Sequence, residues 1–174
     1  MKLKLLTLLA LFLFSFNAIA QSYKIGYVDV EKILSEWPAS KEADTELQKY
    51  QVELNEKLQA KVKDFQTKLT NYNENKLSMS VNVQRDTESQ LYILQLDIEE
   101  FKVSAEQLIS EKNLKLLLTL EEKLNNTITA FGKENAYTHI FAQNSVLFTT
   151  ETETSNSDDI SSKVAQKLGF TLSK

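Results

Sequence analysis

The chain is constrained most by an apolar residue at every third or fourth position, a pattern that extends over residues 47–72 and again over 91–131, where it slips phase at Lys112. Its first half consists of Leu47, Tyr50, Leu54, Leu58, Val62, Phe65, Leu69 and Tyr72. Its second half consists of Leu91, Leu94, Ile98, Phe101, Ala105, Leu108, Leu117, Leu120, Leu124, Ile128 and Phe131. A stripe this narrow, between charged residues, is typical of two helices that pack along a seam. The sequence has one proline and three glycines, so its helices can run long without interruption.

Two long helices joined by a tight turn follow from this pattern. Pro38 suits the first turn of a helix, because proline fixes a helical φ where its missing N–H is not needed. We expect one helix over residues 38–77 and a second over 81–134, with serines between them that suit a turn and an N-cap. Residues 38–134 therefore predict an antiparallel helical hairpin with its tip near 78–80. An arm of roughly forty residues would be roughly 55–60 Å long.

Short strands are expected on both sides of this hairpin. Residues 23–30 alternate as a strand does, and Asp29 is positioned to cap a short helix over 30–35. After residue 135 the pattern changes to period two. Strands over 137–142 and 146–150, separated by a short polar turn, indicate a β-hairpin.

The remainder of the chain completes the expected fold. Asn135 is a candidate left-handed cap for the long helix, and a polar loop over 151–157 precedes a last helix over 162–168. Ser161 or Asp159 would cap that helix, and Gly169 would follow its end. The fold class is α+β, mainly α, with the helical hairpin inserted as a coiled-coil arm into a small antiparallel β body. The body is expected from residues 21–37 and 135–174.

The first twenty residues have the pattern of a signal peptide. Two lysines precede an apolar run over residues 5–16, and Ala18-Ile19-Ala20 gives the small residues that signal peptidase accepts. The run is shorter than the roughly 20 residues that span a bilayer. We therefore expect export, with cleavage after Ala20 and a mature chain that begins at Gln21. No cysteine is present, so no disulfide can form.

Charge and composition exclude several functions. Without the signal the chain has 18 basic and 24 acidic side chains, a net charge of −6. This balance argues against nucleic-acid binding, which favours a basic face. Three glycines, far apart in the sequence, do not form a glycine-rich phosphate-binding loop. We therefore expect no nucleic-acid partner and no nucleotide cofactor.

The sequence also has no constellation of catalytic or metal-binding residues. His139 is the only histidine, so a zinc site has no second nitrogen or sulfur ligand. Glu99 and Glu100 point about 100° apart on a helix, which suits a solvated face better than acid–base chemistry. Asp158 and Asp159 suit helix capping and lack the spacing of a calcium loop. We predict neither an enzyme nor a metal or cofactor site.

Apolar side chains that the seam leaves over are candidates for binding other polypeptides. These are Tyr72, Leu77, Met79, Val81 and Val83 near the tip, and Tyr92, Ile93 and Ile109 beside the seam positions. Exposed apolar atoms on a slender arm can contact many partners with little demand on geometry, and methionine adapts well to such contacts. The alternative is that the seam consumes every apolar residue of the arm.

Three parts of the chain form a recognisable combination. They are IGYVDVEKIL near the mature start, the charged helical arms, and ENAYTHIFAQNSVLF followed by DISSKV. In these residues and in the order of its elements the chain resembles the Skp/OmpH family of periplasmic chaperones. The resemblance covers essentially all of the mature chain. The two terminal motifs are moderately specific, whereas the arms would match any coiled coil.

The resemblance implies a periplasmic homotrimer with three arms around a central cavity, which holds unfolded outer-membrane proteins without nucleotide. The residues expected at the trimer contacts are Ile25, Tyr27, Val28, Ile140, Phe141, Val146 and Phe148. The best-known members have strongly basic arms that attract acidic clients and lipopolysaccharide. Here residues 61–90 have five basic and four acidic side chains, which favours an apolar grip and leaves lipopolysaccharide contact open.

Two functions remain after these exclusions. The first is an ATP-independent holdase that shields unfolded outer-membrane precursors between its arms through many weak contacts. The second is a structural coiled-coil or adaptor protein of the envelope, whose arms dock one fixed partner helix. The adaptor would form a single tight complex, whereas the holdase would bind a heterogeneous set of clients.

Overall fold

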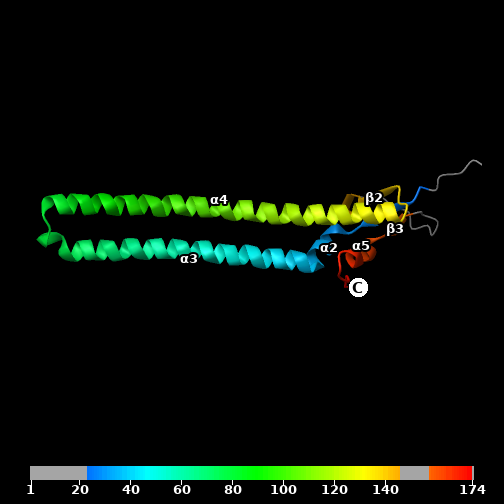
Figure 1. Ribbon diagram of the computed structural model, residues 1–174, viewed down its shortest axis with the longest axis horizontal. Coiled ribbons are helices and arrows are strands. Elements are labelled where there is room, and N and C mark those ends of the chain that lie inside the picture. The colour runs from blue at the N-terminus through cyan, green and yellow to red at the C-terminus, as the bar shows by residue number, and fades with distance from the viewer. Residues whose placement is uncertain (1–22, 146–156, 174) are drawn as a thin grey trace, which may run out of the picture.

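The computed structural model describes residues 23–145 and 157–173. One long rod of two helices extends from a small base that contains the strands and the short helices (Figure 1). The expected signal peptide, the expected strand 146–150 and nearly all of the expected loop 151–157 lie outside the described residues.

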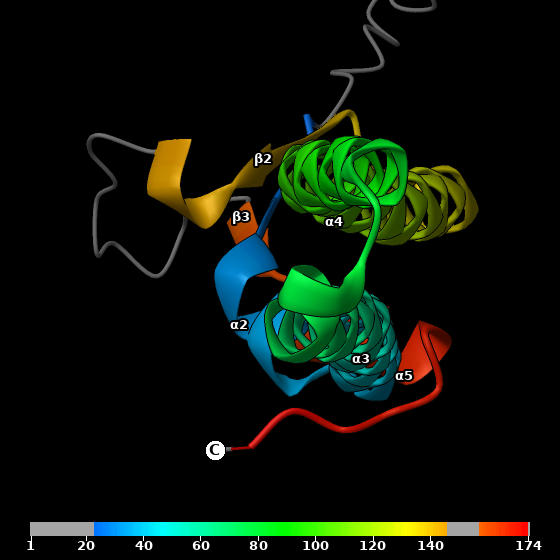
Figure 2. The same cartoon turned by 90° about the vertical axis from the view of Figure 1, so that its left-hand side faces the viewer.

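The arm is the predicted antiparallel hairpin. Helix α3 spans Pro38–Asn75, the 3-10 turn η2 spans Lys76–Ser78, and helix α4 spans Val81–Glu134. The two helices lie side by side along the arm, and η2 joins them at the tip (Figures 1 and 2). Pro38 occupies the first turn of α3, as expected.

The tip is closed by hydrogen bonds from two side chains. Ser80 is the N-cap of α4, and its hydroxyl accepts a hydrogen bond from the N–H of Val83. The side-chain amide of Gln84 donates to the carbonyls of Lys76 and Met79, at 3.0 and 3.1 Å. These contacts satisfy backbone groups that a helix end leaves unpaired, so a short turn suffices.

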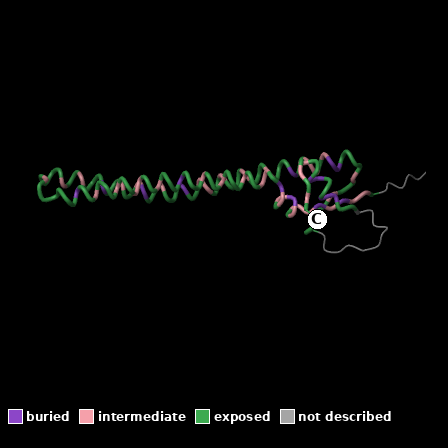
Figure 3. The backbone as a smooth tube through the Cα atoms, turned by 90° about the horizontal axis from the view of Figure 1, so that it is seen from below, coloured by how far each residue is buried: buried purple, intermediate pink, exposed green. Residues whose placement is uncertain are grey.

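The seam follows the predicted stripe over most of its length. Leu54 and Tyr72 of α3 are buried in it, as are Leu91, Ile98 and Ala105 of α4. Few residues of the arm are buried at all, and they are spread along its length, whereas the base has a concentrated interior (Figure 3). The arm is therefore a thin two-helix structure without a core of its own.

The prediction that Leu117 belongs to the seam was wrong. Leu117 is 48% exposed, and the half-buried Leu116 takes its place. Lys112 itself lies in the seam and pairs with Glu46 across the two helices. Steps of four residues from Leu108 through Lys112 and Leu116 carry the stripe on, because four residues exceed one helical turn only slightly.

Within residues 23–145 and 157–173, the base has a three-stranded sheet in the order β2-β1-β3. Strand β1 spans Ile25–Val28, β2 spans His139–Ala142 and β3 spans Ser157–Asp159. Both pairs are parallel, with Gly26 opposite Ile140 and Asp158. The predicted antiparallel sheet was therefore wrong. The chain leaves the end of β1, runs out along α3 and returns along α4, so it enters β2 from the same end as β1.

After Ala142 the chain makes the expected turn, the 3-10 turn η3 over Gln143–Ser145, and the expected partner strand lies outside the described residues. The C-terminal region differs from the prediction in two places. Strand β3 was not predicted. The left-handed residue after α4 is Ala136, with a φ of 55°, whereas Asn135 has a φ of −108°.

The core of the base lies where the short helices meet the sheet and the root of α4. Helix α2 spans Val30–Glu36 and helix α5 spans Ser161–Lys167. The buried cluster consists of Val28, Ile33, Trp37, Leu124, Phe131, Ile160 and Val164. Full burial of each such side chain stabilises the fold by roughly 1.5–3 kcal/mol.

A chain of hydrogen bonds joins the two terminal regions of the base. Asp29 caps α2 as predicted, accepting from the N–H of Lys32 at 2.9 Å. The N–H of Asp29 donates to the hydroxyl of buried Ser161 at 2.8 Å, and this hydroxyl donates to Asp159 at 2.6 Å. Through these hydrogen bonds the base holds both ends of the arm in one unit.

Gly169 follows α5 with a φ of 92°, also as predicted.

Candidate functional site

Helix α4 has two apolar faces. Leu91, Ile98 and Ala105 are buried against α3. A second set is exposed and consists of Tyr92, Ile93, Leu96, Val103, Leu114, Leu117 and Leu118. In this set, Tyr92, Leu96, Val103 and Leu114 are separated by roughly one, two and three helical turns, so they share one side of the helix.

The exposed face lies opposite the seam. Leu96 and Ile98 are two residues apart, which places them about 200° apart around the helix. Leu96 is 50% exposed and Ile98 is 7% exposed. We call the exposed side of α4 between Tyr92 and Leu118 the outer face.

Helix α3 has no comparable face among the residues that the structure describes. Its one exposed large apolar residue there is Val52. Its outward side instead has oppositely charged pairs one turn apart, Lys57 with Glu53 at 2.6 Å and Lys68 with Asp64 at 2.8 Å. The arm is therefore apolar on one side only.

The tip extends the exposed apolar surface. Leu77 in η2 is fully exposed, and Val81 and Val83 in the first turn of α4 are exposed as well. Met79 is half-buried between them. The exposed apolar residues of the tip therefore precede the outer face along the arm, with Leu77 in η2 and Val81 and Val83 in α4.

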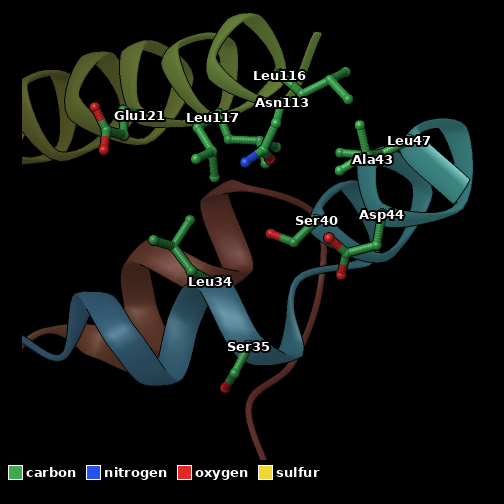
Figure 4. A pocket seen from close by; sticks show the side chains of 11 residues that line it. Leu34, Ser35, Ser40, Ala43, Asp44, Leu47, Asn113, Leu116, Leu117 and Glu121 are labelled. Carbon is green, nitrogen blue, oxygen red and sulfur yellow. The ribbon is translucent and has the colours of Figure 1, made fainter. Parts of the chain in front are cut away.

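At the other end, the outer face reaches a pocket at the root of the arm. The pocket has a volume of about 290 Å³ and lies between α2, α3 and α4. Leu34, Leu47 and Leu117 project toward it, with Asp44 and Glu121 at its rim (Figure 4). Leu117 thus belongs to both the outer face and the pocket.

The predicted binding residues differ in how far they are exposed to solvent. Leu77, Val81, Val83, Tyr92 and Ile93 are exposed. Met79 and Ile109 are half-buried. That any of these residues binds another polypeptide stays a prediction.

The expectation that Tyr72 is left over from the seam was wrong. Tyr72 is 5% exposed, and its hydroxyl donates a hydrogen bond to Glu88 of α4. This hydrogen bond is the main cause that raises the pKa of Tyr72 and lowers the pKa of Glu88. Lys76 lies 3.6 Å from Glu88 and completes the cluster. A tyrosine can occupy a seam because its ring is apolar and its hydroxyl reaches a partner at the edge.

Sequence reasoning missed four residues of the outer face and misplaced a fifth. Leu96, Val103, Leu114 and Leu118 were not predicted, and Leu117 was assigned to the seam. A signal for them existed. Tyr92, Leu96, Val103 and Leu114 repeat at whole helical turns, on the side opposite Leu91 and Ile98.

The residues expected at the trimer contacts also differ in how far they are buried. Val28 is 2% exposed and lies in the core of the base, and its contact with another subunit stays a prediction. Ile25, Tyr27 and Ile140 are half-buried, while Phe141 is exposed and stacks on His139 at 5.9 Å between ring centroids. Val146 and Phe148 lie outside the described residues.

Three of the four acidic residues weighed as catalytic or calcium-binding, Glu99, Asp158 and Asp159, have structural partners. Glu99 pairs with Lys102 at 2.9 Å, and Asp159 accepts from the N–H of Ser161 at 2.9 Å. Asp158 accepts a hydrogen bond of 2.8 Å from the hydroxyl of Tyr137. Burial and this hydrogen bond raise the pKa of Tyr137 to about 12. Within the described ranges, no three His, Asp or Glu residues gather as metal ligands would.

Within residues 23–145 and 157–173, no helix combines the length and the apolar character needed to cross a bilayer.

Comparison with known proteins identifies the family. Residues 24–168 match the model of the family described as outer membrane protein (OmpH-like). The chain belongs to this OmpH-like family, whose members are periplasmic chaperones and generally non-enzymatic. A search of curated proteins gives no significant match.

A solved structure has the same fold. It is the crystal structure of a candidate outer membrane chaperone (OmpH-like) from Caulobacter crescentus CB15, with a TM-score of 0.70. The two chains are 11% identical, and the match covers 87% of this chain and 91% of that one. At this identity the match establishes a common fold.

Proposed function

We propose that the protein is an ATP-independent periplasmic holdase that binds unfolded outer-membrane protein precursors along its arms. The observation that carries the proposal is the outer face of α4, where seven large apolar side chains are exposed. Isolated exposed apolar residues are ordinary, but a line of them along one side of a helix is typical of a binding surface.

The shape of the outer face suits unfolded clients. Its apolar residues are spread along the arm and do not form one deep pocket, so each contributes a small contact. Many weak contacts along a flexible client add up to a stable complex, because each contact raises the local concentration of the next. Such a surface demands little of the client's sequence.

We also propose that the base forms a trimer, with the arms around a common cavity. Among the residues that the structure describes, strand β2 is at an edge of the sheet, and Phe141 on it is exposed. An exposed edge strand offers backbone groups that a second subunit can pair. Ile25, Tyr27, Ile140 and Phe141 remain the candidate contact residues.

The regular spacing of the outer face also favours a second candidate, an adaptor that docks one partner helix. A partner helix that packed along α4 would contact apolar residues spaced at whole helical turns. A holdase binds many unrelated unfolded chains, whereas an adaptor binds one folded partner. The two functions therefore differ in their clients.

An aggregation assay tests the holdase. A urea-denatured β-barrel membrane protein is diluted into buffer with stoichiometric amounts of the purified protein, and light scattering is followed. The wild type should suppress scattering. The variant Leu96→Ser/Val103→Ser/Leu114→Ser should require about tenfold more protein, because it loses three apolar contacts.

The matched control changes the other helix. Val52→Ser/Ala60→Ser on the exposed side of α3 should suppress scattering as the wild type does. A wild type that fails to suppress scattering contradicts the holdase, and equal losses in the two variants contradict the role of the outer face.

A further inference from the structure

The middle of the outer face, between Ile98 and Glu111, is flanked by negative charge, whereas Lys115 lies near its root end. Between Ile98 and Glu111 the helix has four glutamates, Glu99, Glu100, Glu106 and Glu111, and a single lysine, Lys102. All four glutamates are exposed. At about 100° per residue, Glu99 and Glu106 lie on one side of the line through Leu96 and Val103, and Glu100 and Glu111 lie on the other.

These carboxylates are incompletely neutralised. Lys102 pairs with Glu99 at 2.9 Å, and Glu111 accepts a hydrogen bond from the neutral Gln107 at 2.8 Å. Glu100 and Glu106 take part in no ion pair within the described part of the chain. Asp97 on the same helix differs, because Lys61 of α3 pairs with it across the seam at 2.6 Å.

We propose that the outer face selects client segments in which apolar side chains alternate with lysine or arginine. This proposal rests on the proposed holdase function and specifies its client class. The apolar line would bury the client's apolar side chains, and the glutamates on both sides would face its cationic ones. Charge complementarity of this kind adds specificity to an apolar contact that has little of its own.

The same charges disfavour a second copy of the chain on this surface. Two outer faces in contact would bring eight glutamates together around one apolar seam, and like charges at close range oppose association. The face is therefore available to clients in an assembly built through the base.

Three peptides with the same alternating apolar residues test the selection. Their intervening positions are lysine in the first, glutamine in the second and glutamate in the third, and each has a fluorescent label. Anisotropy titrations with the purified protein at low salt should rank them lysine, glutamine, glutamate. The lysine and glutamate peptides should differ about tenfold or more in affinity, because the small contributions of several exposed charge pairs add up.

Salt separates the two components of binding. At 1 M salt the Debye length falls to about 3 Å, so the three affinities should converge on that of the glutamine peptide. Retention of the full preference at high salt would contradict an electrostatic origin.

Two charge variants locate the selection. Glu99→Gln/Glu100→Gln/Glu106→Gln/Glu111→Gln should lose most of the preference for the lysine peptide. The control Glu53→Gln/Glu56→Gln/Asp64→Asn/Glu74→Gln removes the same number of charges from α3 and should keep it. Circular dichroism checks that both variants stay helical.

The outcomes distinguish the two proposals. Equal binding of all three peptides, a preference for the glutamate peptide, or loss of selection only in the α3 variant overturns the client class and leaves the holdase standing. Failure of all three peptides to bind contradicts the holdase itself, and with it this inference.

Discussion

Leu96 and Ile98 lie two residues apart on α4 and face opposite sides of it, Leu96 toward solvent and Ile98 toward α3. The hairpin needs only one apolar stripe per helix to close its seam. Ile98 and its neighbours supply that stripe, so Leu96, Val103 and Leu114 contribute nothing to it. Exposed apolar residues that do not stabilise the arm are available to bind something else.

The base and the outer face should respond differently to mutation. Ile33 is fully buried in the base, so Ile33→Ala should reduce the free energy of unfolding by about 2–5 kcal/mol. Leu114→Ser on the outer face should change it by about 0.5 kcal/mol or less. Urea unfolding followed by circular dichroism measures both. A large loss for Leu114→Ser would mean that this residue is buried in the assembled protein.

The cap of α2 gives a second test of the base. Asp29→Ala removes the acceptor for the N–H of Lys32 and should cost about 0.5–2 kcal/mol. Asp29→Asn should cost less, because asparagine caps helices nearly as well. Equal losses in the two variants would show that the charge of Asp29, and not its capping hydrogen bond, matters.

Tyr137 predicts a loss of stability at alkaline pH. Its pKa is raised from 10.0 to about 12 in the folded protein, mainly by burial. A raised pKa means that its contribution is complete below pH 10 and is lost as the pH rises through 12. The free energy of unfolding should therefore fall over this range, and phenolate absorbance should show one late-titrating tyrosine. Tyr137→Phe should abolish that late titration and reduce the alkaline loss.

The tip should weaken in acid. The hydrogen bond from Tyr72 lowers the pKa of Glu88 below 4.5, and Lys76 acts in the same direction. A lowered pKa gives stability that is present above pH 4.5 and is lost as the pH falls through the folded value. Amide hydrogen exchange, corrected for its intrinsic pH dependence, should show the tip losing protection on acidification. In Tyr72→Phe the tip should be less protected at neutral pH and should respond less to acid.

Much of the architecture was predictable because helix periodicity is a local property. The three-to-four spacing, Pro38 and the serines near residue 80 sufficed for the hairpin and its tip. Asp29 as a cap and Gly169 after α5 followed from the backbone demands of helix ends. The prediction that Leu117 lies in the seam was wrong, because a shift of one residue changes which side of a helix faces its partner.

The sheet could not be predicted in the same way. The direction of β2 relative to β1 depends on the end of the sheet to which α4 brings the chain back. No local sequence pattern predicts this. Strand β3 contains Ser157, Asp158 and Asp159 and has no apolar pattern at all. It is held by the N–H of Ile160, which donates to the carbonyl of Tyr27 at 3.0 Å, and by Tyr137, whose hydroxyl donates to Asp158.

The candidate site was predictable in part. The tip residues and Tyr92 and Ile93 stood out as apolar residues beside the seam. The expectation that Tyr72 is exposed was wrong. Its apolar ring can be buried in the seam because its hydroxyl has a hydrogen-bond partner, Glu88. The continuity of the outer face emerged only when the structure fixed which side of α4 contacts α3.

Site-specific crosslinking tests most directly whether clients bind the outer face of α4. A photoreactive amino acid is placed at Leu96 or Val103 on α4, or at Val52 or Ala60 on α3, and the protein is irradiated with an unfolded β-barrel client. Strong crosslinks to the client from the two α4 positions and weak ones from the two α3 positions are predicted. Equal crosslinking from both helices, or crosslinking from α3 alone, would contradict a one-sided arm.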